Sequence, residues 1–65
     1  MTDYLKLVKA ELEQADFKFA RHGKGSHDVW RNAKTGKSIP LPKKIPSRDF
    51  ANRILKEAGI NKKFS

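Results

Sequence analysis

The sequence contains no cysteine, which excludes disulfide bonds and thiolate metal sites as means of stabilising so short a chain. Its two histidines, His22 and His27, are too few for a structural zinc site without further ligands. A chain of 65 residues buries only roughly 60% of the surface that its unfolded form exposes. We therefore expect a single small domain over residues 1–65, with a modest apolar core and with no metal or other cofactor.

Long apolar runs are missing as well. No segment approaches the roughly 20 apolar residues that a membrane-spanning helix needs. The first residues, Met1 to Tyr4, do not combine a basic segment with an apolar stretch, so we expect no signal peptide. The expected location is the cytoplasm.

Acidic residues are scarce in the middle of the chain. Lys and Arg number 15 and Asp and Glu number 7, which gives a net charge of +8. Between Phe17 and Arg48, Asp28 is the only acid against nine bases, so this stretch carries the whole net charge. The nine bases are Lys18, Arg21, Lys24, Arg31, Lys34, Lys37, Lys43, Lys44 and Arg48. Positive charge concentrated in one stretch of the chain indicates a polyanionic ligand, although a solvated, solubilising face would have the same composition.

Most enzyme signatures are absent too. The sequence has no phosphate-binding loop and no nucleophile elbow. From Asp28 onward the acids are Asp28, Asp49 and Glu57, too few and too scattered for a two-metal nuclease. If the protein is an enzyme, histidine is the candidate titrating group, because its pKa lies near operating pH.

The hydrophobic periodicity predicts a helix, three strands and a second helix. Apolar residues recur at helical spacing over 2–15 and 48–58. Residues 17–21, 26–32 and 37–41 resemble strands separated by glycine turns. The predicted fold is α+β: a three-stranded antiparallel sheet with both helices on one face and the other face open.

Single residues refine this prediction at the helix ends. Thr2 is the expected N-cap of the first helix, and Asp3 suits the positive end of its dipole. Ser47 is the expected N-cap of the second helix, with Asp49 in its first turn. Gly59 is placed to end that helix.

The strands carry their own predictions. Phe17 and Phe19 alternate with polar residues, so both are expected to face the core. Val29 and Trp30 are adjacent and must point to opposite faces, and the pattern alone leaves open which one is buried.

Two prolines indicate an edge strand. Pro40 and Pro42 lie two residues apart, so the positions that lack an N–H point the same way in the sheet plane, and the strand can pair only on its other side. Ile39 and Leu41 would then pair inward and share the core face.

Residues 21–27 place two imidazoles, a hydroxyl and two cations around a glycine turn. RNA supplies its own nucleophile, the 2′-hydroxyl, so a histidine that takes this proton beside phosphate-binding cations is sufficient for cleavage without a metal. His27 is the candidate catalytic residue, although both histidines could be ordinary surface residues. The candidate RNA-binding residues are Arg21, Lys24, Ser26, Arg31, Lys43, Lys44 and Arg48.

Four segments together resemble the HicA (YcfA-like) toxin family. They are Gly25-Ser26-His27, the strand Phe17–Arg21 that precedes it, the sequence Ser-Ile-Pro-Leu-Pro at 38–42, and the closing Ala-Asn-Arg-Ile-Leu-Lys-Glu-Ala-Gly-Ile at 51–60. The tripeptide alone is a weak signature of the family. Together with the sequence of the closing helix and the length of the chain, it is a fairly specific one.

The resemblance implies a fold like the double-stranded-RNA-binding domain, ribonuclease activity on mRNA and a HicB-type antitoxin as partner. The catalytic histidine of the family corresponds to His27. Many members continue the third strand with Pro-x-His, where this chain has Pro42-Lys43-Lys44; a lysine must supply that role here, or the role is dispensable.

Two non-enzymatic interpretations remain at this point. The chain could be a double-stranded-RNA-binding module that does not cut, since Lys43, Lys44 and Arg48 flank the start of the second helix, where backbone N–H groups favour phosphate. It could also be a ribosome-associated or DNA-binding protein that uses charge alone.

Overall fold

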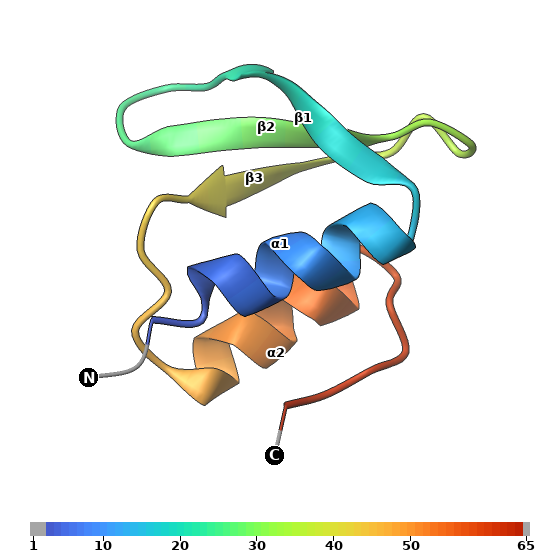
Figure 1. Ribbon diagram of the computed structural model, residues 1–65. Helices are drawn as coiled ribbons and strands as arrows, with labels where there is room; N and C mark the ends of the chain where they lie inside the picture. The colour runs from blue at the N-terminus through green and yellow to red at the C-terminus, as the bar shows by residue number, and fades with distance from the viewer. Residues whose placement is uncertain (1–2, 65) are drawn as a thin grey trace.

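The computed structural model describes residues 3–64. A helix is followed by three strands and a second helix, the order predicted from the sequence. The strands form an antiparallel sheet in the order β1-β2-β3. Both helices lie on the same side of this sheet (Figure 1), so the molecule has one sheet layer and one helix layer. The predicted α+β architecture is confirmed.

Helix α1 spans Leu5–Gln14 and buries Val8 and Leu12. It begins later than the expected residue 2, and the Thr2 cap lies outside the described residues. The Asp3 carboxylate accepts hydrogen bonds from the Leu5 N–H at 3.0 Å and from the Ile45 N–H at 3.2 Å. Asp3 thus satisfies an amide at the open end of the helix and ties it to the segment after β3.

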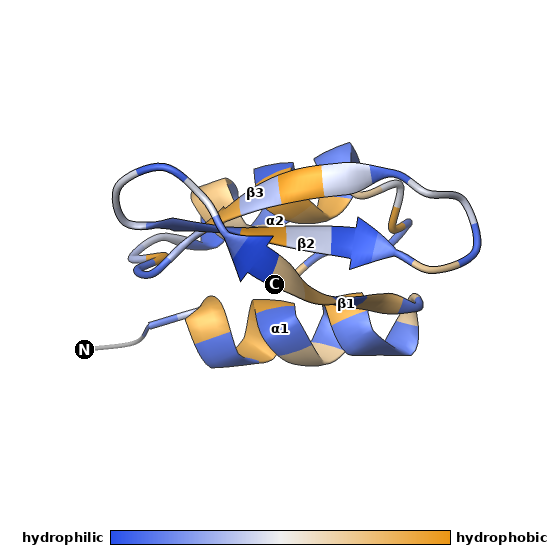
Figure 2. Cartoon of the chain, turned by 90° about the horizontal axis from the view of Figure 1, so that it is seen from above, coloured by the Kyte–Doolittle hydropathy of each residue, from blue (hydrophilic) through white to orange (hydrophobic). Residues whose placement is uncertain are grey.

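Helix α2 spans Arg48–Glu57 and follows the sequence prediction closely. The Ser47 hydroxyl accepts from the Phe50 N–H at 3.1 Å, as an N-cap should. Asp49 lies in the first turn, and Gly59 follows the helix with a φ of +78°, the left-handed conformation that glycine tolerates best. Both helices show alternating hydrophilic and hydrophobic bands (Figure 2), which is the amphipathic pattern that predicted them.

The sheet consists of β1 (Phe17–His22), β2 (His27–Asn32) and β3 (Ser38–Pro42). Strand β3 is an edge strand, as its two prolines predict. Ile39 and Leu41 are buried while Pro40 is exposed. The inward orientation of Ile39 and Leu41 is therefore confirmed.

The core lies between the sheet and the helices. Its buried apolar residues are Val8, Leu12, Phe17, Trp30, Ile39, Leu41, Ile45, Ala51, Ile54, Leu55 and Ala58. Trp30 is only 5% exposed, which decides the question that the Val29-Trp30 pair left open. Ile45, in the loop after β3, is fully buried. It belongs to no periodic pattern, so the sequence did not predict its burial.

The prediction that Phe19 faces the core is wrong. Phe17 is fully buried, but Phe19 is 48% exposed. Phe19 is the partner of Trp30 across the β1–β2 ladder, so its side chain does lie on the helix side of the sheet. Strand β1 is an edge strand, and the helices cover it at Phe17 but leave Phe19 half open.

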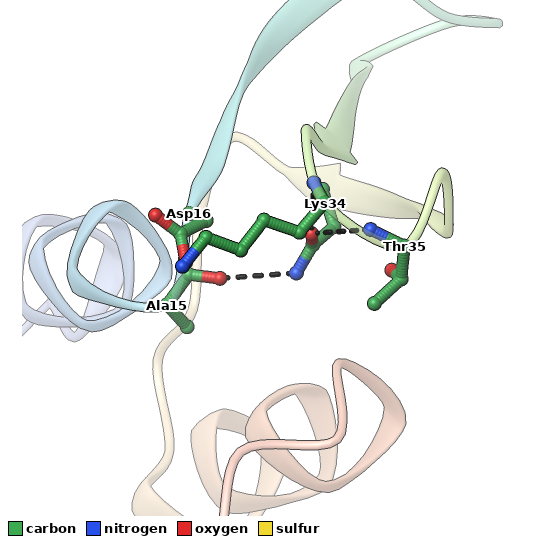
Figure 3. A network of polar contacts seen from close by, with 5 residues as sticks. Ala15, Asp16, Lys34 and Thr35 are labelled. Carbon is green, nitrogen blue, oxygen red and sulfur yellow. Dashed lines mark hydrogen bonds and ion pairs between the residues drawn. The ribbon is translucent and has the colours of Figure 1, made fainter.

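Asn32 is the one polar residue among the buried side chains of residues 3–64, and it joins two turns. Its side-chain amide donates to the Ala15 carbonyl at 3.0 Å, and its side-chain oxygen accepts from the Lys34 and Thr35 N–H groups at 2.7 and 2.9 Å. The Lys34 ammonium also lies 3.3 Å from the Asp16 carboxylate. Figure 3 shows how this network ties the β2–β3 turn to the end of α1.

Candidate nucleic-acid interface

The open face of the sheet, away from the helices, is defined by the register of the strands. Side chains alternate between the two faces of a strand, so the partners of the outward-facing β2 residues share their face. The open face carries Lys18, Arg21, His27, Val29, Arg31, Ser38, Pro40 and Pro42. None of these residues is acidic, and three of them, Lys18, Arg21 and Arg31, are cationic.

A β-bulge in β1 determines the face on which His22 lies. The β1–β2 register shifts between Phe19 and Arg21, so Ala20 is the extra residue. Beyond the bulge, His22 pairs with Asp28 on the helix side of the sheet, whereas His27 lies on the open face.

Asp28, the one acid of the basic stretch, lies on the helix side of the sheet because it alternates with His27 and Val29 along β2, and His22 contacts it there. The His22 Nδ1 lies 3.0 Å from the Asp28 carboxylate, and the His22 ring contacts Phe19 edge-on with 5.2 Å between ring centroids. The negative charge of Asp28 is therefore directed to the opposite side of the sheet from His27.

His27 begins β2, directly across from Pro42. Its carbonyl accepts from the Gly23 N–H at 2.8 Å, and its own N–H donates to the Lys24 carbonyl at 3.2 Å. The backbone of His27 is thus fixed by the turn, while its side chain is exposed. An exposed imidazole on a fixed backbone is accessible to a substrate that approaches the open face.

Gly23 lies where the turn closes against His27. A Cβ on Gly23 would lie 3.0 Å from the His27 carbonyl oxygen and 3.3 Å from the Val29 Cγ2 atom. These distances are shorter than most Cβ contacts, so a side chain at position 23 requires the His27 backbone or the Val29 side chain to shift by a few tenths of an ångström. Gly25 is different: its φ is +63°, but the space around it is open.

Three candidate RNA-binding residues surround the start of β2. Lys24 and Ser26 belong to the turn that precedes His27. The Lys43 N–H donates to the Ser26 carbonyl at 3.2 Å, which brings the segment after β3 against the same turn. Lys24, Ser26 and Lys43 therefore gather at the His27 end of the sheet.

Arg21 and Arg31 extend the positive surface along the open face. Arg21 is the β1 partner of Val29, and Arg31 is the β2 partner of Ser38. Lys18 pairs with Arg31 on this face but was not among the predicted site residues. Its alternation with Phe17 and Phe19 was the signal that could have identified it.

Lys44 and Arg48 lie apart from this group. Arg48 is the first residue of α2, in the helix layer. Lys44 is near Asp3, where hydrogen bonds from the Leu5 and Ile45 amides and the charge of Lys44 hold the pKa of the Asp3 carboxyl below its ordinary value of 3.8. The structure does not bring these two cations to the open face.

Two further structural findings concern residues 3–64. No group of three or more His, Asp and Glu side chains in this part of the chain is arranged to hold a metal ion. Neither helix of the described residues has the length and apolar character to cross a membrane.

Comparison with known protein families gives a match. Residues 6–60 match the family model described as "HicA toxin of bacterial toxin-antitoxin". This match extends from α1 to the residue after the glycine that ends α2, and so includes all three strands. No curated protein and no solved structure matches the chain.

Proposed function

The chain belongs to the HicA toxin family of bacterial toxin–antitoxin systems, and on that premise we propose that it is an endoribonuclease that cleaves mRNA in the cytoplasm. Membership of the family implies an antitoxin partner. The observation that carries the proposal is the position of His27, an exposed imidazole on a sheet face that has several cations and no acid.

In this proposal His27 is the general acid–base group. Its imidazole takes the proton of a 2′-hydroxyl, and the 2′-oxygen attacks the adjacent phosphorus. A new bond from the 2′-oxygen to phosphorus forms as the bond to the 5′-oxygen breaks. The leaving 5′-oxygen receives a proton from the imidazolium or from water, which yields a 2′,3′-cyclic phosphate and a 5′-hydroxyl.

The cations near His27 hold the phosphate in this scheme. Lys24 and Lys43 are on the segments that meet at the start of β2. Arg21 lies across from Val29, the next residue of β2 after His27 that faces the open side. Cations fixed beside the reacting phosphate stabilise the charge that develops on its oxygens in the transition state. Ser26 and Arg31 would contact the neighbouring nucleotides, and Lys44 and Arg48 would bind more distant phosphates on the helix side.

The scheme needs no metal ion, because the nucleophile comes from the RNA and the proton acceptor from His27. The inhibitor that we propose is a HicB-type antitoxin that covers the open face. Positive charge concentrated on one surface favours rapid encounter with an acidic partner as well as with RNA.

End-group analysis tests this function. The protein is incubated with labelled RNA in the presence of a chelator, and with a matched oligonucleotide that carries a single 2′-deoxy position at the cleavage site. The proposal predicts cyclic phosphate and 5′-hydroxyl ends, an unchanged rate with the chelator and no cleavage at the deoxy position. Binding without cleavage would instead identify a double-stranded-RNA-binding module, and cleavage at the deoxy position would exclude the 2′-hydroxyl as nucleophile.

A further inference from the structure

A second basic surface lies in the helix layer. A groove of about 510 Å³ is lined by Asp49, Asn52, Arg53, Lys56, Ile60, Asn61, Lys62 and Lys63. Four of these residues are cations and one is an acid. None of them belongs to a strand, so this groove is separate from the open face that carries His27. We propose that this groove, which we call the tail groove, is a second binding site for the phosphate backbone of RNA.

Linear sequence hides this concentration of charge. Outside the stretch from Phe17 to Arg48 the chain has six bases and six acids, which cancel. Folding separates them: the bases Arg53, Lys56, Lys62 and Lys63 line one groove, where Asp49 is the only acid. The acids elsewhere are directed to other partners, as Asp3 is to backbone amides and Asp16 to Lys34.

The wall of the groove is a fixed part of the fold. After α2 the chain turns at Gly59 and runs back beside the helix layer (Figure 1). The Asn52 side chain donates to the Phe64 carbonyl at 3.2 Å and accepts from the Phe64 N–H at 2.7 Å. The Phe64 ring also lies 5.6 Å from the Tyr4 ring, centroid to centroid.

One cation of the groove has a structural role. The Lys62 ammonium lies 2.9 Å from the Glu11 carboxylate, which attaches the tail to α1. Arg53, Lys56 and Lys63 are exposed and have no ion-pair partner among residues 3–64. These three side chains are therefore available to an external anion.

The composition of the groove favours a nucleic-acid backbone over a protein partner. The core of a protein–protein interface is apolar and rich in aromatic side chains, whereas the only apolar side chain in the lining is Ile60. Arginine, lysine and asparagine side chains are the usual contacts of phosphate and sugar. Such contacts add affinity without selecting a sequence.

The dimensions of the molecule allow one RNA to reach both surfaces. The longest extent of the Cα trace is 31 Å, and a strand that contacts both the tail groove and His27 must also pass around the edge of the molecule, so it needs more than about ten nucleotides at about 3.4 Å each. A dinucleotide is too short. The inference rests on the proposed RNA substrate, but the binding assay below uses a probe that cannot be cleaved, so failure of the catalytic scheme and failure of the groove are separable.

The test compares two double variants that each lower the net charge by two. Arg53→Gln/Lys56→Gln changes the groove, and Lys6→Gln/Lys9→Gln changes the surface of α1 as the matched control. Fluorescence anisotropy with a 2′-O-methyl single-stranded RNA, longer than about ten nucleotides, gives the affinity as a function of salt. Arg53→Lys/Lys56→Arg retains both charges and checks that the groove acts through charge.

We expect the groove variant to bind more weakly than the control, with a salt slope lower by about 0.7 for each phosphate that is no longer neutralised. If the variant loses contacts to two phosphates, the ratio of wild-type affinity to variant affinity should fall about sevenfold when the salt concentration rises from 50 to 200 mM. Cleavage of a dinucleotide should be unchanged, and the charge-preserving variant should bind normally.

Equal RNA affinities of the groove variant and the control would overturn the proposal. So would a loss of binding in the charge-preserving variant that matches the loss in the groove variant. Weaker binding of polyglutamate with unchanged RNA binding would assign the groove to an acidic protein partner and would likewise overturn it.

Discussion

His22 and His27 lie on opposite faces of the sheet, because the bulge between Phe19 and Arg21 places His22 opposite Asp28 on the helix side. A substrate on the open face meets His27 and not His22. We therefore predict that His22→Ala lowers the rate of RNA cleavage by less than about tenfold, well below the roughly 10²–10⁴-fold contribution of a general acid–base group. Single-turnover cleavage rates measure this, and a loss as large as that of a His27 variant would indicate a two-histidine mechanism instead.

The turn before His27 provides a second prediction. Gly23→Ala forces a Cβ to within 3.0 Å of the His27 carbonyl oxygen. The backbone that positions His27 must then shift, at a cost of about 1–3 kcal/mol in the free energy of unfolding, and cleavage should fall with it. The control is Gly25→Asn, because φ is +63° there with open space around it and asparagine tolerates this conformation. Equal effects of the two substitutions on cleavage would contradict the role of the close approach at Gly23.

The cap at Asp3 predicts how stability responds to acid. The amides of Leu5 and Ile45, together with the charge of Lys44, hold the pKa of Asp3 below its ordinary value of 3.8. A carboxyl whose pKa is lower in the folded state stabilises the fold fully above its unfolded pKa, and this contribution disappears as the pH falls through the folded pKa. Asp3→Asn should therefore lower the free energy of unfolding at neutral pH, and the difference from the wild type should vanish well below pH 3.8. Urea denaturation across this range measures both, and a difference independent of pH would show that the charge of Asp3 is not involved.

Sequence patterns predicted most of this fold because they reflect local physics. Ser47 begins α2 and Gly59 ends it through local geometry: a side-chain cap at Ser47 and a left-handed backbone at Gly59. Pro40 and Pro42 identify an edge strand because proline lacks an N–H. What the patterns missed depends on distant parts of the chain. Phe19 is half exposed because the helices leave that part of an edge strand uncovered.

Buried loop and turn residues were missed for the same reason. Ile45 and Asn32 are buried through interactions with segments far away in the sequence. For the candidate site, the sequence indicated His27 and its neighbouring cations, because they are contiguous or lie in paired strands. It could not show that His22 lies on the other face beside Asp28, or that the tail groove gathers four cations, since the first follows from the bulge and the second from the packing of the tail.

The antitoxin should respond to the same cations as the RNA. Reversal of Lys24 or Lys43 to glutamate should slow association with a HicB-type antitoxin about tenfold at low salt, with a smaller effect on dissociation, because complementary charge acts mainly on encounter. The same variants should bind RNA more weakly. Stopped-flow association and RNA binding are measured on each variant. Loss of RNA binding with unchanged antitoxin association at low salt would show that the antitoxin docks elsewhere and does not cover His27.

The most direct test of the account is the cleavage rate of His27→Ala. Its side chain is exposed and outside the core, so the variant should keep the far-ultraviolet circular dichroism, the unfolding midpoint and the RNA affinity of the wild type. Its single-turnover cleavage rate should fall by at least about 10²–10⁴-fold, the contribution of general acid–base catalysis. A folded His27→Ala protein that binds RNA and cleaves it at a rate near that of the wild type would contradict the assignment of His27 as the catalytic residue.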